Sequence, residues 1–166
     1  MRWTVELTRV AQDKQIRAAF LAHYSIEGWE KPLAVTLTLK RALQADGGWV
    51  KGDEHHYSRA LTHALNVVNH RCFGPRWRAK GVRLKVIPVR ETNASGRCHY
   101  HLAVDCPEHK TGAWFVDAMK SAWKGTDWGH NEMDFQVADQ GWLRYMAKSR
   151  SKEDLADAID WGNFHF

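Results

Sequence analysis

The sequence has few cysteines and no long apolar run, and each absence excludes a class of protein. Its three cysteines, Cys72, Cys98 and Cys106, are odd in number and form no CxxC pair, so neither a disulfide framework nor a thiolate zinc site is expected. Reduced cysteines are typical of the cytoplasm. Because no stretch of about 18 apolar residues occurs and the N-terminus lacks the apolar centre of a signal peptide, we expect a cytoplasmic protein without a membrane partner.

Internal repeats, low-complexity stretches and evident linkers are also absent, which favours one domain over residues 1–166. Within it we expect an N-terminal helical arm (1–25), a catalytic core (33–150) and a C-terminal extension (151–166). Acidic residues are fewer than basic ones, 19 against 24, which leaves a net charge of +5. A basic chain attracts polyanions such as nucleic acids. The nine tryptophans supply core area or surfaces that stack on unpaired bases.

The periodicity of the apolar residues predicts an α+β fold. LAVTLTLK alternates strictly, as a half-buried strand does, and Pro88, which cannot donate to a strand ladder, places its own strand at a sheet edge. The expected elements are strands at 33–40, 81–91, 97–106 and 132–138, helices at 4–23, 54–70, 110–124, 140–150 and 152–159, and a loop at 46–52. Their order is that of the ferredoxin-like split βαβ fold. We expect an antiparallel central sheet with helices on one face and an open catalytic face.

The segment CHYHLAV carries two histidines, His99 and His101, at a spacing that puts both side chains on one face of a strand. If the preceding turn pairs this strand with the one before it, Glu91 lies opposite His99 on the same face. Two imidazoles and a carboxylate suit Mn²⁺ or Mg²⁺ and leave coordination positions open for a phosphate oxygen. The alternative is a pair of ordinary surface histidines. The other histidine pair, His55 and His56, is expected to face solvent.

The segment GWLRYMAKS places Tyr145 and Lys148 three residues apart on a predicted helix, and therefore on one face. An apolar stripe on the other side would hold this helix to the body: Leu143, Met146 and Ala147. A phenol is a weak nucleophile at neutral pH, but a metal bound to the target phosphate and a nearby ammonium both favour its attack. The pair is thus predicted to be a nucleophile and its companion. The alternative is a tyrosine that packs at the helix edge beside a solvated lysine.

These segments resemble the motifs of the HUH endonuclease superfamily, and specifically those of its single-tyrosine rolling-circle replication initiators. LAVTLTL resembles the first motif, CHYHLAV the second, and YMAK the third. The resemblance implies a ferredoxin-like fold and a Mn²⁺ or Mg²⁺ ion bound by Glu91, His99 and His101. It further implies that Tyr145, with Lys148, nicks single-stranded or hairpin DNA of a phage or plasmid. The products would be a 5′-phosphotyrosine link and a free 3′-OH.

Further residues and partners follow from the same resemblance. Contacts with DNA are expected from five residues: Thr36, Thr38, Arg76, Arg78 and Arg144. A single tyrosine in the third motif excludes a mechanism that shuttles DNA between two tyrosines. Because no Walker A segment GxxxxGK[ST] is present, unwinding would require a host helicase as a partner. We expect the protein itself to be a monomer.

Three other functions fit parts of the pattern. A single-tyrosine HUH transposase shares the nicking step, but it needs a dimer and paired terminal hairpins, and it usually has glutamine where Lys148 stands. A non-catalytic nucleic-acid-binding module on the same fold would bind without a metal and would form no covalent adduct. A metal-dependent RNA nuclease would cut without covalent attachment.

Overall fold

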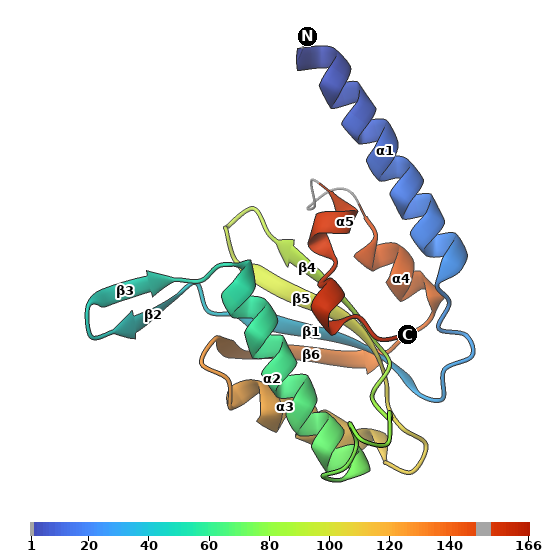
Figure 1. Cartoon of the computed structure of the whole chain (residues 1–166), viewed down its shortest axis with the longest axis vertical. Coiled ribbons are helices and arrows are strands. Elements are labelled where there is room, and N and C mark those ends of the chain that lie inside the picture. The colour runs from blue at the N-terminus through green and yellow to red at the C-terminus, as the bar shows by residue number, and fades with distance from the viewer. Residues whose placement is uncertain (1, 149–153) are drawn as a thin grey trace.

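A four-stranded antiparallel sheet forms the centre of the computed structural model, which describes residues 2–148 and 154–166 (Figure 1). Its strands are β1 (Pro32–Leu39), β4 (Val86–Thr92), β5 (Cys98–Asp105) and β6 (Gly129–Val137). They lie in the order β4-β5-β1-β6, and each neighbouring pair is antiparallel. This order, with a helix after the first strand and another after the third, confirms the predicted split βαβ fold.

The long helices α2 (Glu54–Phe73) and α3 (Gly112–Lys124) cover one face of the sheet. The alternation of β1 explains why: Val35, Leu37 and Leu39 are at most 1% exposed and pack under these helices. The buried stripe predicted for the first long helix is confirmed, since Tyr57, Leu61, Leu65 and Val68 all belong to this core. The side chains of Asp53 and Thr111 cap the two helices at their N-termini.

The second face of the sheet is less open than the sequence predicts. Three helices cover part of it: α1 (Arg2–His23), α4 (Gln140–Met146) and α5 (Leu155–Ala158). They pack over small and β-branched side chains of the sheet, including Ala34, Ala103 and Val89. The cover is incomplete, because the neighbouring positions on this face are polar. The open part is therefore a limited area around the histidines, with helices at its border.

The strand β4 lies at the edge of the sheet, as Pro88 predicts, but that edge is not bare. The C-terminal segment pairs with it through two isolated bridges, Val86 with His165 and Val89 with Ile159. In addition, the backbone N–H of Asp160 donates to the carbonyl of Pro88 at 3.1 Å. The C-terminal extension thus protects a strand edge that would otherwise invite pairing with another chain.

A buried polar network ties this segment to the core. The hydroxyl of Tyr100 and the amide of Asn163 each donate to Asp160 Oδ2 at 2.9 Å, and Ser58 Oγ donates to Asp160 Oδ1 at 3.0 Å. Burial and the neighbouring carboxylate raise the pKa of Tyr100, so its hydroxyl stays protonated and can donate. Local sequence patterns could not reveal this network, because its members are far apart in the chain.

We predict that Asp160→Ala lowers the free energy of unfolding by about 3 kcal/mol, because it leaves buried donors without an acceptor. Denaturation by urea, followed by circular dichroism, measures the change. Asp117→Ala on the exposed surface of α3 is the matched control and should change stability by less than about 0.5 kcal/mol. Equal midpoints for the two variants would show that the network contributes nothing to stability.

Four boundaries differ from those predicted. The segment expected to be a loop at 46–52 belongs to a hairpin of two short strands, β2 (Ala42–Ala45) and β3 (Gly48–Lys51), which projects from the body (Figure 1). Its turn is possible because Gly48 adopts a φ of 118°. The edge strand begins at Val86 rather than near 81, and α4 ends at Met146. The predicted helix residues 149 and 150, and the start of the predicted helix at 152, lie outside the described residues.

None of the helices in the described part of the chain combines the length and the apolar character that crossing a membrane requires.

Candidate active site

The sheet register gathers the predicted ligands on its second face. Glu91 pairs with His99 across β4 and β5, which confirms the predicted register. On the other side of β5, Thr38 pairs with His99, and Thr36 pairs with His101. Directly opposite residues of an antiparallel pair share a face, so all five side chains form one polar patch in the middle of the sheet.

The two threonines orient the histidine rings. Thr36 Oγ1 lies 3.1 Å from His101 Nδ1, and Thr38 Oγ1 lies 3.1 Å from His99 Nδ1. The rings are nearly parallel, at 18°, with centroids 6.4 Å apart. With Thr38 only 2% exposed, its hydroxyl is available to His99 rather than to a DNA strand. Contact between either threonine and DNA stays a prediction.

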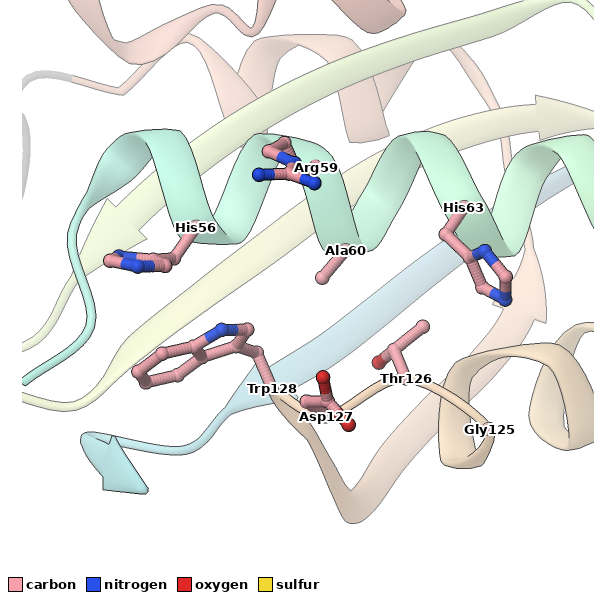
Figure 2. Close-up of a pocket in the computed structure, with 8 residues that line it drawn as sticks. All are labelled: His56, Arg59, Ala60, His63, Gly125, Thr126, Asp127 and Trp128. Atoms are coloured by element: carbon pink, nitrogen blue, oxygen red, sulfur yellow. The ribbon is translucent and has the colours of Figure 1, made fainter. Parts of the chain in front are cut away.

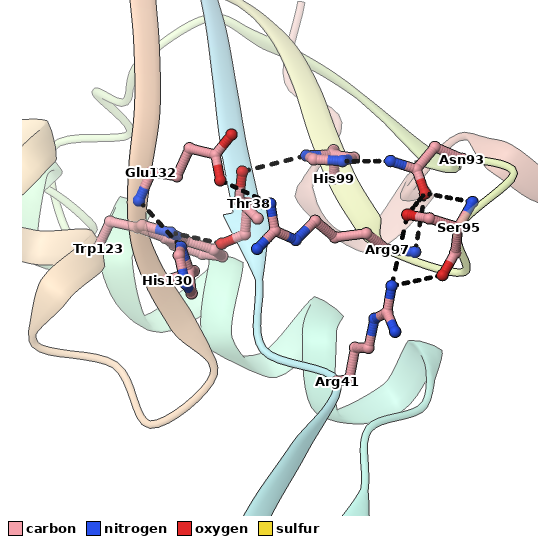
Figure 3. A network of polar contacts seen from close by, with 9 residues as sticks. All are labelled: Thr38, Arg41, Asn93, Ser95, Arg97, His99, Trp123, His130 and Glu132. Carbon is pink, nitrogen blue, oxygen red and sulfur yellow. Dashed lines mark hydrogen bonds and ion pairs between the residues drawn. The ribbon is translucent and has the colours of Figure 1, made fainter.

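The hydrogen bonds around Asn93 indicate the tautomer of His99. Asn93 Oδ1 accepts from the backbone N–H groups of Ser95 and Arg97, so the amide nitrogen faces His99 Nε2 at 3.4 Å (Figure 3). His99 Nε2 therefore accepts, and Nδ1 carries the hydrogen that Thr38 accepts. Burial lowers the pKa of His99, which favours the neutral ring. A neutral imidazole whose Nε2 carries no hydrogen is the form that binds a metal.

The carboxylate of Glu91 contacts the second histidine rather than the one opposite. Its Oε2 lies 3.2 Å from His101 Nε2, and His101 is only 7% exposed. Among residues 2–148 and 154–166, no three His, Cys, Asp or Glu side chains converge into a ready metal site. The amide of Asn93 occupies the position that a cation at His99 Nε2 would take. The donor types fit a hard divalent cation, and its binding stays a prediction.

Helix α4 brings the predicted nucleophile to the histidines. The ring of Tyr145 meets that of His101 edge-on, with centroids 5.4 Å apart and an interplanar angle of 83°. Tyr145 is 39% exposed, so its hydroxyl can reach a bound strand. Sequence reasoning missed Trp142, which stacks on Tyr145 at 5.1 Å and donates from Nε1 to the carbonyl of Leu102 at 2.9 Å. Its place one helical turn before the tyrosine was the available signal.

Lys148 lies on the same side of the segment as Tyr145, as its spacing predicts. Its Nζ is 4.7 Å from the centroid of the tyrosine ring, within the range of a cation–π interaction. The stripe predicted to hold the helix is confirmed, because Leu143, Met146 and Ala147 are all buried in the second core. The packing of this stripe turns the tyrosine and the lysine toward the polar patch.

The three arginines predicted to bind DNA do not gather in one place. Arg144 is exposed on α4, next to Tyr145 in the chain. Arg76 and Arg78 lie in the loop after α2, where Arg78 covers the ring of Trp77 at 4.6 Å. That loop leads to the start of β4, whereas Glu91 lies near the other end of the strand. Contact of these side chains with DNA stays a prediction.

The other histidine pair takes no part in this site. Figure 2 shows His56 in a pocket between α2 and the segment 125–128, on the face that the long helices cover. Its ring packs on Trp128, with centroids 4.9 Å apart, and its Nδ1 lies 2.8 Å from Asp53 Oδ1. His55 faces solvent as predicted, but His56 is half-buried against the tryptophan, so the prediction was wrong for that residue.

Comparison with known proteins places the chain in a family. No curated protein and no solved structure matches it. A family model, that of the replication-associated protein ORF2, matches residues 32–154. This range is more than half of the 166 residues and includes the whole polar patch, Tyr145 and Lys148. The chain therefore belongs to the ORF2 family of replication-associated proteins.

Proposed function

We propose that this protein is a single-tyrosine HUH nuclease that nicks single-stranded DNA, remains attached to its 5′ end and so initiates rolling-circle replication. Its family assigns it to DNA replication and points to DNA as its partner. The observation that carries the proposal is the contact of Tyr145 with His101, which in turn contacts Glu91. An exposed phenol beside two imidazoles and a carboxylate has the composition of a phosphotransfer site.

The reaction proposed for Tyr145 is an in-line exchange of one phosphodiester for another. The phenolic oxygen attacks the phosphorus, the bond from phosphorus to the 3′-oxygen breaks, and the phenolic proton is balanced by the proton that the 3′-OH acquires. No external oxidant or energy source is needed, because the new phosphotyrosine ester replaces the old ester. The ammonium of Lys148, 4.7 Å from the ring centroid, stabilises negative charge on the phenolic oxygen or on the phosphate.

We propose that Glu91, His99 and His101 hold a Mn²⁺ or Mg²⁺ ion. When bound, this ion would polarise the target phosphate as a Lewis acid. Thr36 and Thr38 position the two rings from behind through Nδ1, as residues behind a metal ligand commonly do. The pairing of the Glu91 carboxylate with His101 Nε2 at 3.2 Å supports a cation here. A carboxylate and an imidazole nitrogen at this distance need a proton or a positive ion between them.

Two end-labelled substrates test the proposal. The wild-type protein is incubated with a randomised single-stranded oligonucleotide pool that carries the label at its 3′ end or at its 5′ end. With Mn²⁺, we expect an SDS-stable adduct that carries the 3′ label, because the protein keeps the 5′ end of the downstream fragment. Chelation by EDTA should abolish the adduct.

The other outcomes contradict the proposal in distinguishable ways. DNA binding that never yields an adduct, with either metal, would indicate a non-catalytic binding module. An adduct that carries only the 5′ label would reverse the polarity of the attack. An adduct that forms equally in EDTA would remove the metal from the mechanism.

A further inference from the structure

The hairpin β2–β3 carries a large aromatic side chain that the core does not use. Trp49 is 74% exposed, whereas Trp123 in the core is fully buried. The opposite face of the hairpin is anchored, since Leu43 packs against the main core. Trp49 and Lys51 are two residues apart in β3 and so share the other face. An exposed indole beside a cation indicates a binding surface.

An open groove connects Trp49 with the candidate active site. It has a volume of about 610 Å³ and is lined by Trp49, Arg41, Asn93 and Arg97, among others. Asn93 is also the residue that contacts His99 Nε2. The groove therefore runs from the edge of the histidine site to the hairpin, without crossing the core.

The charges along this groove favour a polyanion. Arg41 donates to the carbonyl of Ser95, which joins the base of the hairpin to the turn between β4 and β5 (Figure 3). Arg97 is paired with Glu132 at 2.7 Å, so its charge is largely neutralised. Within the described part of the chain, neither Arg41 nor the exposed Lys51 forms an ion pair with an acidic side chain. These two cations lie on either side of the indole in the sequence.

We propose that the Trp49 face of the hairpin binds the unpaired DNA strand next to the nick, with the indole stacked on a base and with Arg41 and Lys51 at phosphates. The inference rests on the proposed function, since it names the strand that the groove would lead to His99. An unpaired strand is specified because an indole can stack only on a base whose face is open. Cations without base-specific donors then hold the backbone irrespective of sequence.

Fluorescence anisotropy of a labelled oligothymidylate, measured in EDTA so that no chemistry occurs, tests the proposal. Trp49→Ala should raise Kd roughly tenfold, because one base–aromatic stack is lost. Trp49→Phe, which keeps an aromatic ring, should restore most of the affinity. The matched control is Trp114→Ala, which removes another exposed indole beside a lysine, Lys110, with Nζ 4.3 Å from the ring centroid. It should bind like the wild type.

Wild-type affinity in Trp49→Ala would overturn the proposal. An equal loss on a blunt duplex would also overturn it, because paired bases offer no face to the indole. Thermal melting of each variant excludes misfolding as the cause of a loss. Since binding in EDTA requires no nucleophile, failure to form a covalent adduct would refute the proposed nuclease without changing this result.

Discussion

Tyr145→Phe abolishes the SDS-stable adduct, by at least about a thousandfold in rate, if the proposed mechanism is correct. The substitution removes only the hydroxyl. The ring that stacks on Trp142 and meets His101 remains, so the fold and the DNA affinity should be preserved. The readout is the yield of adduct with the 3′-labelled pool in Mn²⁺, together with the Kd of the same pool in EDTA.

Tyr24→Phe is the matched control for this prediction. The ring of Tyr24 packs against Phe20 and Phe164, away from the polar patch, so its hydroxyl should have no effect on adduct formation. If Tyr145→Phe forms the adduct as the wild type does, a different residue is the nucleophile. Loss of DNA binding along with the adduct would show that the hydroxyl holds the strand and would leave its chemical role unsupported.

His101→Ala should reduce adduct formation by at least about a hundredfold and should weaken Mn²⁺ binding, because it removes a ligand. His101 is the central side chain of the site: it contacts Thr36, Glu91 and Tyr145. Isothermal titration calorimetry with Mn²⁺ measures the binding directly, so the prediction does not depend on activity alone. Wild-type Mn²⁺ affinity in this variant would exclude His101 as a ligand.

Two further variants separate ligation from a general loss of structure. Thr36→Val keeps the shape of the side chain but removes the contact with His101 Nδ1, and should weaken Mn²⁺ binding by only about tenfold. His63→Ala changes a histidine in the pocket on the opposite face and should leave both Mn²⁺ binding and adduct formation unchanged. A loss of Mn²⁺ binding in His63→Ala would place the metal elsewhere.

Local patterns in the sequence were enough to predict the second face of the sheet. The alternation in CHYHLAV separates His99 and His101 from Tyr100 and Leu102, and the structure buries the latter two completely. The turn after β4 sets the register that places Glu91 opposite His99. These inferences succeeded because they depend on the geometry of one strand or one hairpin, which neighbouring residues determine.

Other features depended on segments that are distant in the chain. The role of Trp142 requires α4 to dock beside β5, and Asn93 acts on His99 only because its own turn directs its amide there. The hairpin of Trp49 escaped prediction because its four-residue strands are exposed and carry no apolar alternation.

By itself, the sequence determined the fold class, the shared face of the two histidines and the side of the helix that carries Tyr145, because period-two and helical patterns are local. Only the tertiary structure decided the distance from Tyr145 to His101, the partial covering of the second face and the pairing of the C-terminal segment with β4. Each of these depends on how separate elements pack against one another, and packing between distant segments leaves no periodic trace in the chain.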